Sequence, residues 1–208
     1  VTVRELDKAL GDLTRAAQLV EGRSDEPEPD SDPSRPPSTT LHFSVFYHLG
    51  LARYLKGDFA GAEKAYRLCL DRARGSDDRL VSATDWLYMT LRRLGRTDDA
   101  ARLLEPIHAG LDVKQDRSYL NRLLMYKGVY APEDLLRAGG DPLTRDTYGY
   151  AVGNLYLYGG KKDEAPAGAP AMAHHHQHQS GPAAEKPFPA KVAVSTAHCG
   201  SGCTVGDL

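Results

Sequence analysis

The sequence predicts an all-α protein, built as a short α-solenoid of antiparallel helical hairpins. Two apolar, periodic stretches within residues 49–66 are separated by Gly57 and Asp58, which is typical of two helices folded back on each other. The same turn, followed by alanine, recurs in residues 94–100 and 158–165. A hairpin cannot bury its apolar face alone, so repeated hairpins stack on their neighbours and leave a concave surface for a partner.

The turns recur at regular intervals, which supports an internal repeat. The residues five positions after the turn glycines are separated by 38, 33 and 32 residues. A period of about 20 to 50 residues is the signature of stacked repeat architectures. The turn glycines are Gly57, Gly95, Gly128 and Gly160, and the residues five positions later are Ala62, Ala100, Glu133 and Ala165.

Residues 1–22 are expected to form an amphipathic helix that caps the array. Apolar side chains recur there every three or four residues, Thr2 can cap the start, and Gly22 can end the helix. Residues 23–40 follow as a largely irregular linker, because they contain five prolines and several acidic residues but almost nothing apolar to bury.

The repeat domain is expected over residues 41–165. It begins with an apolar helix that ends at Gly57. Pro132 fits the first position of a later helix, because that position needs no backbone N–H donor. The remaining helices are expected over residues 59–74, 80–94, 98–109, 117–126, 132–138 and 145–158.

The last hairpin is expected to be incomplete. Its second helix should begin near Ala165, but residues 166–170 contain prolines and a glycine that cannot continue a helix. Residues 166–208 therefore form an irregular tail, explained by a fusion, a frame artefact or a chimera, or by a natural variant with a shortened last repeat. The apolar side chains of residues 145–158 would then lack a cover, so this end is expected to fray, to self-associate, or to be covered by residues 188–194.

The chain resembles tetratricopeptide-repeat proteins over about residues 43–165. Arg53 departs from the family pattern, because it replaces a tyrosine, and Tyr88 and Asn121 replace the small glycine in the middle repeats. The resemblance implies a scaffold that binds a partner segment in a groove lined by the first helix of each hairpin. The first-repeat residues that match the pattern are Phe46, Leu49, Gly50, Ala62 and Tyr66.

Composition and motifs argue against several other functions. The net charge of -2 gives no reason to expect nucleic acid or an anionic membrane as partner. No apolar run approaches the roughly 18 residues of a membrane span, and no nucleophile elbow or glycine-rich phosphate loop occurs. We therefore expect a cytoplasmic protein that is no enzyme and needs no cofactor. Because the chain begins with Val1, we also expect it to be a fragment or a processed form.

The partner of such a scaffold is expected to be a protein or peptide. Tyrosine and arginine side chains on the first helices would contact it in the groove, although packing between helices or exposure to solvent is the open alternative. The residues predicted to bind the partner are Arg53, Tyr88, Arg92 and Tyr156.

The tail resembles a different protein family from the one that the helical repeats resemble. Residues 186–208 include the run His-Cys-Gly-Ser-Gly-Cys-Thr-Val-Gly-Asp and resemble a segment that leads into a membrane helix in a family of uncharacterised bacterial integral-membrane proteins. Imidazole and thiolate groups suit zinc or another transition metal, so a metal-handling accessory protein is the alternative function, although the histidines could be a purification-tag relic. The candidate metal ligands are His174, His175, His176, His178, His198, Cys199 and Cys203.

Overall fold

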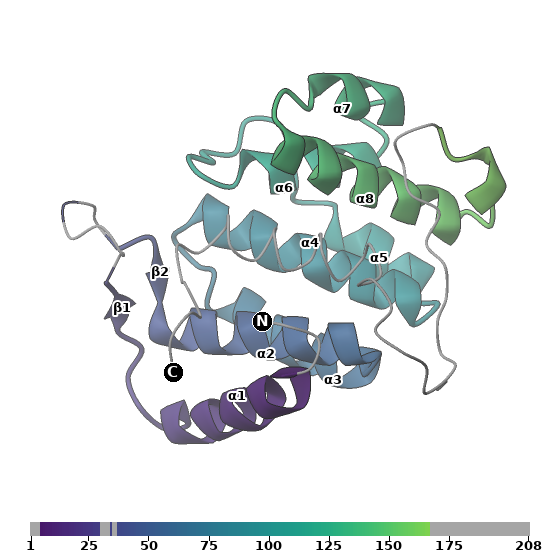
Figure 1. The fold of residues 1–208 in the computed structure, drawn as a ribbon. Helices are drawn as coiled ribbons and strands as arrows, with labels where there is room; N and C mark the ends of the chain where they lie inside the picture. Colours follow the sequence, from purple (N-terminus) through teal and green to yellow (C-terminus); the bar gives the residue numbers. More distant parts are fainter. Residues whose placement is uncertain (1–4, 30–33, 35–36, 167–208) are drawn as a thin grey trace.

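The computed structural model describes residues 5–29, 34 and 37–166, and this part of the chain is all-α, as predicted (Figure 1). A pair of two-residue strands, β1 (Pro27–Glu28) and β2 (Thr39–Thr40), is the exception. The helices are α1 (Leu6–Val20), α2 (Leu41–Lys56), α3 (Phe59–Asp71), α4 (Asp77–Arg93), α5 (Thr97–Leu103), α6 (Arg117–Tyr126), α7 (Pro132–Ala138) and α8 (Pro142–Tyr158), followed by the 3-10 helix η2 (Lys162–Glu164).

The helices form successive hairpins, α2 with α3, α4 with α5, and α6 with α7. The first helices α2, α4, α6 and α8 pack on one another in sequence, so they lie side by side (Figure 1). Each predicted turn glycine adopts a positive φ that side chains with a Cβ rarely adopt. The φ angles are 79° at Gly57, 73° at Gly95, 81° at Gly128 and 71° at Gly160.

The N-terminal helix α1 packs on α2, as a cap would, and Lys56 of α2 contacts Asp7 of α1 at 2.6 Å. The predicted linker is not wholly irregular, because its two ends pair as the antiparallel strands β1 and β2. Asp25 accepts hydrogen bonds from the Thr40 hydroxyl at 2.7 Å and from the His42 backbone N–H at 2.9 Å. The linker therefore returns to its starting point and holds the beginning of α2.

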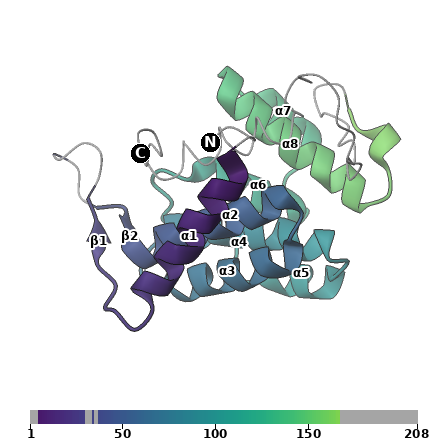
Figure 2. The same cartoon turned by 60° about the horizontal axis from the view of Figure 1, so that its bottom comes forward.

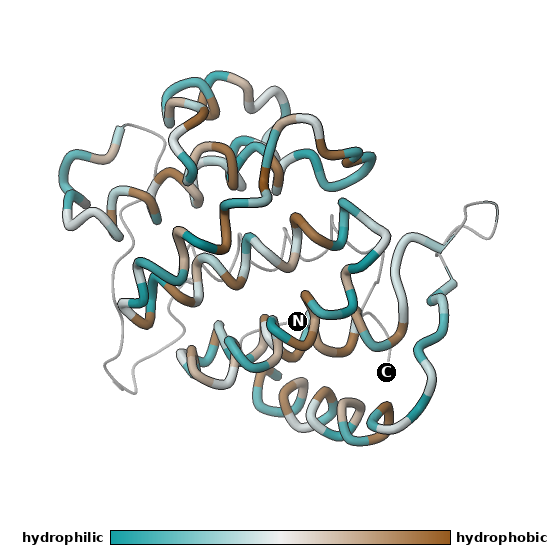
Figure 3. Tube along the Cα trace, turned by 180° about the vertical axis from the view of Figure 1, so that it is seen from behind, coloured by the Kyte–Doolittle hydropathy of each residue, from teal (hydrophilic) through white to brown (hydrophobic). Residues whose placement is uncertain are grey.

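The core centres on α4, whose Trp86 is fully buried. The Trp86 ring stacks on Tyr66 with ring centroids 6.2 Å apart, and its Nε1 donates to the Tyr47 hydroxyl at 2.8 Å. Tyr66 can reach α2 because Gly50 has no side chain there: a Cβ at Gly50 would lie 2.7 Å from the Tyr66 Cζ. Figure 3 shows hydrophobic and hydrophilic residues alternating along the helices, as expected of helices with one buried face.

Helix α5 ends earlier than the sequence pattern predicted. It stops at Leu103, whereas the apolar pattern suggested a helix to residue 109. Pro106 explains the difference, because proline disfavours helical geometry at the residue before it and lacks the N–H that the helix needs.

Helix α8 does not present the uncovered apolar face that was expected of an incomplete hairpin. Tyr148, Tyr150 and Val152 are at most 4% exposed, and the helix packs against α4, α6 and α7. The large hydrophobic side chains of α8 are buried or half-buried. Helices α4, α6 and α7 cover these side chains, so the apolar patch expected for self-association is not present at them.

Candidate functional site

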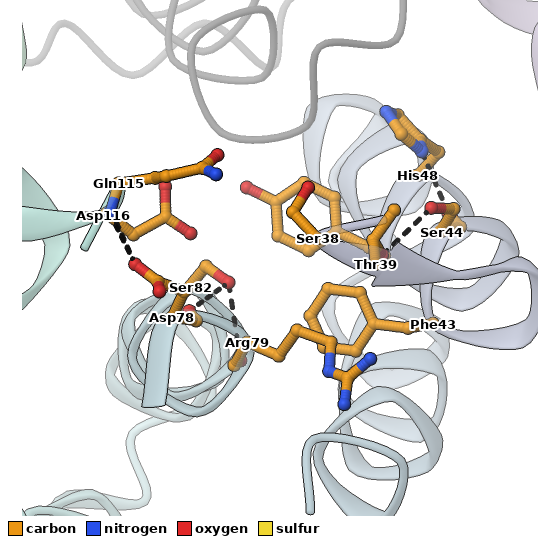
Figure 4. A pocket seen from close by; sticks show the side chains of 11 residues that line it. Ser38, Thr39, Phe43, Ser44, His48, Asp78, Arg79, Ser82, Gln115 and Asp116 are labelled. Atoms are coloured by element: carbon orange, nitrogen blue, oxygen red, sulfur yellow. Dashed lines mark hydrogen bonds between the residues drawn. The ribbon is translucent and has the colours of Figure 1, made fainter. Parts of the chain in front are cut away.

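A small polar cleft opens where the N-terminal ends of α2 and α4 meet the turn before α6 (Figure 4). The Thr40 hydroxyl caps α2 by accepting from the Phe43 N–H at 3.4 Å, and the Ser76 hydroxyl caps α4 by accepting from the Arg79 N–H at 3.3 Å. These caps fix where the two helices begin. The cleft is lined by Ser38, Thr39, Phe43, Ser44, Tyr47, His48, Asp78, Arg79, Ser82, Gln115 and Asp116.

The cleft is too small for an ordinary metabolite. Its enclosed volume is about 20 Å³, which corresponds to roughly one water-sized sphere. Small-molecule sites in proteins usually occupy about 300 to 1,000 Å³. The cleft can therefore receive the tip of one side chain rather than a whole ligand.

Asp78 holds in place the turn before α6, which forms one wall of the cleft. Its carboxylate accepts backbone N–H donors from Lys114 at 3.1 Å and from Gln115 and Asp116 at 2.8 Å each. The turn that precedes α6 is thereby fixed to the start of α4. This arrangement also brings a second carboxyl, that of Asp116, close to the charge of Asp78.

Asp116 is the group with the most unusual electrostatics in the cleft. It is 5% exposed, and within the described residues it forms no ion pair. Burial raises the pKa of its carboxyl to about 8, and the charge of Asp78 adds to this effect, whereas Arg122 and the Ser82 hydroxyl oppose it. Near neutral pH this carboxyl is mostly protonated, and a cation entering the cleft would favour its ionised form.

Behind the cleft lies a network of buried polar side chains. The Tyr47 and Tyr119 hydroxyls are 2.7 Å apart, and the Arg122 guanidinium lies 4.4 Å from the centroid of the Tyr119 ring. Arg122 in turn donates to the Asp85 carboxylate at 2.6 Å. Burial raises the pKa of Asp85 to about 6, although the charge of Arg122 acts in the opposite direction. These interactions connect α2, α4 and α6 behind the cleft.

Helix α2 forms the wall of the cleft opposite Asp116, and this wall carries His48. His48 Nδ1 lies 2.8 Å from the Ser44 carbonyl oxygen one turn earlier, and the Ser44 hydroxyl donates to Glu28 of β1. In Figure 4, His48 and Asp116 come from opposite sides of the cleft. The strand pair therefore helps to position this wall.

Of the four residues predicted to bind a partner, Tyr88 and Arg92 contact each other. Tyr88 is only 3% exposed and stacks on Tyr126 with ring centroids 4.4 Å apart, so the expectation that it contacts a partner was wrong. Arg92 donates to the Tyr88 hydroxyl at 3.1 Å and to the Tyr158 carbonyl at 3.0 Å, which makes it a packing residue. Arg53 is half-buried and donates to the Gly61 carbonyl at 3.3 Å, and Tyr156 is half-buried beside α6.

The proposed metal ligands lie outside the described residues, so the structure does not bear on them. They are His174, His175, His176, His178, His198, Cys199 and Cys203. Within the described ranges, no group of three or more His, Cys, Asp or Glu side chains is placed to hold a metal ion. No helix in those ranges is long and apolar enough to cross a bilayer.

Comparison of the chain with protein-family models, with curated proteins and with solved structures gives no match.

Proposed function

We propose that this protein is a non-catalytic scaffold that binds a segment of a partner protein along its stacked helical hairpins. The resemblance to tetratricopeptide repeats supports this proposal, as does the lateral array of α2, α4, α6 and α8. Such arrays use an extended surface of parallel first helices to hold a peptide.

The partner segment carries a basic side chain that enters the polar cleft. The observation that carries this step is Asp116, a buried carboxyl with a pKa of about 8 and no cation paired to it. A guanidinium or ammonium group would pair with that carboxylate and restore its ionised form. The cleft volume of about 20 Å³ fits a terminal ammonium group or one N–H edge of a guanidinium.

Selection of peptides from a random display library against the full chain tests the proposal. We expect enriched peptides to share an arginine or lysine, and Asp116→Asn to weaken their binding about tenfold or more, as expected for the loss of a charge-assisted hydrogen bond. Asp112→Asn is the matched control, because Asp112 lies nearby but its side chain is 81% exposed. Enriched peptides without a basic residue, or equal binding to Asp116→Asn, would contradict the proposal.

The same assay distinguishes the scaffold function from the metal-handling alternative. Peptide binding that disappears when a chelator is added would favour the His- and Cys-rich tail. Binding that is unchanged by the chelator supports the scaffold.

A further inference from the structure

A second and larger cavity lies on another side of α2, between α1 and α3. Figure 2 shows α1 crossing over α2 and α3. Residues of all three helices line a cavity of about 430 Å³, which is within the range of small-molecule sites in proteins. It is distinct from the polar cleft, because the two share no lining residue.

The floor of this cavity is apolar. Phe46 and Leu49 of α2 lie at the bottom, and Ala65 and Leu68 come from α3. Leu68 is 40% exposed, so part of this apolar surface faces solvent. A hydrocarbon or aryl group would gain free energy by covering these side chains.

The rim of the cavity is strongly cationic. Four basic residues line it, whereas Glu21 is the one carboxylate among the described residues that do so. None of the four forms an ion pair within the described part of the chain, so their charge is available to an anion. The basic residues are Arg23, Arg53, Lys64 and Arg72.

One of these cations is already held in position. Arg72 lies over the Phe46 ring, 4.8 Å from its centroid, and donates to the Leu68 carbonyl at 2.9 Å. Its Nε also donates to His42 Nδ1 at 3.4 Å. Because Nδ1 of His42 accepts, the neutral ring carries its proton on Nε2. That N–H is buried and finds no hydrogen-bond acceptor among the described residues, and His42 is 5% exposed.

We propose that this cavity binds an amphipathic anion, an alkyl or aryl body that ends in a carboxylate or phosphate. The apolar body covers Phe46, Leu49 and Leu68. The head group pairs with Lys64, Arg53 and Arg72, which the structure leaves without carboxylate partners. The site is independent of the peptide surface, because it selects the opposite charge and lies beside α1.

Isothermal titration calorimetry of the full chain tests this site with four ten-carbon probes. Decanoate and decyl phosphate should bind at one site, and comparing them identifies the preferred head group. Decanol should bind about tenfold more weakly, because it lacks the charge. Decyltrimethylammonium should not bind. Decanol or the cation binding as tightly as decanoate, or no anion binding, would overturn the proposal.

A pair of lysine variants locates the site. Lys64→Gln should weaken decanoate binding about threefold to fivefold, as expected for one exposed charge. Lys8→Gln on α1 is the matched control and should bind as the unchanged protein does, because Lys8 is also exposed but does not line the cavity. Leu68→Trp gives a second readout in the apolar part of the cavity, and its fluorescence should shift on addition of decanoate. Equal affinity in both lysine variants, or a silent tryptophan, would overturn the assignment.

Discussion

Arg122 of α6 donates a 2.6 Å hydrogen bond to the carboxylate of Asp85 of α4, and the two side chains are 1% and 0% exposed. This ion pair joins the second hairpin to the third inside the core. Desolvation of two buried charges largely offsets their attraction, so the intact pair adds little net stability, whereas removing one partner leaves a buried charge without compensation.

Replacing Arg122 alone should therefore be costly. Arg122→Met leaves the Asp85 carboxylate buried without its cation, and we expect the free energy of unfolding in urea to fall by about 3 to 5 kcal/mol. The double variant Asp85→Leu with Arg122→Met removes both charges and should recover much of that loss. A loss below about 1 kcal/mol in Arg122→Met would show that the pair is not buried as described.

Gly50 should tolerate no side chain. Its Cβ would lie 2.7 to 2.9 Å from the Tyr66 ring, which is fully buried and stacked on Trp86, so the ring cannot move aside. We expect Gly50→Ala to lower the free energy of unfolding by about 1 to 3 kcal/mol. Gly11→Ala is the matched control, because a Cβ there meets nothing within 4 Å, and it should stabilise α1 by about 0.5 to 1 kcal/mol. Equal effects of the two substitutions would contradict the close approach of α3 to α2.

Asp116 should make stability depend on pH. Its folded pKa of about 8 exceeds the ordinary value of 3.8, so the folded chain binds more protons between these values. The contribution is fully present below the unfolded pKa and is lost as the pH rises through about 8. The free energy of unfolding should therefore fall by up to about 1.4 kcal/mol per pH unit from this group.

Asp116→Asn provides the comparison, because asparagine does not titrate while Asp85 and the other groups remain. Urea denaturation from pH 5 to pH 8 should show the variant gaining stability relative to the unchanged protein. Parallel curves for the two proteins would contradict the raised pKa.

The helices and their turns could be predicted from sequence because their signals are local. Gly57 and Gly95 stand between periodic apolar stretches, and both adopt the positive φ expected of such turns. The cover over α8 could not be predicted in this way. Tyr150 is buried because α8 reaches α4, about two repeats earlier in the chain, and no local pattern encodes that approach.

The candidate site was missed for a similar reason. Asp116 precedes α6 in a polar stretch and resembles an ordinary helix-capping residue. It becomes buried because Asp78, 38 residues earlier, binds its backbone N–H and draws the turn onto α4. The tyrosines and arginines chosen from the pattern lie on the correct helices, but Tyr88 and Arg92 point into packing contacts.

The pH dependence of peptide affinity tests the central claim most directly. An arginine-containing peptide from the display selection stays positively charged, whereas Asp116 ionises near pH 8. Fluorescence polarisation should show affinity for the unchanged protein rising roughly tenfold from pH 6.5 to pH 8. Asp116→Asn should bind more weakly, with a much smaller pH dependence. Matching pH profiles for the two proteins, or affinity that falls as the pH rises, would contradict the account.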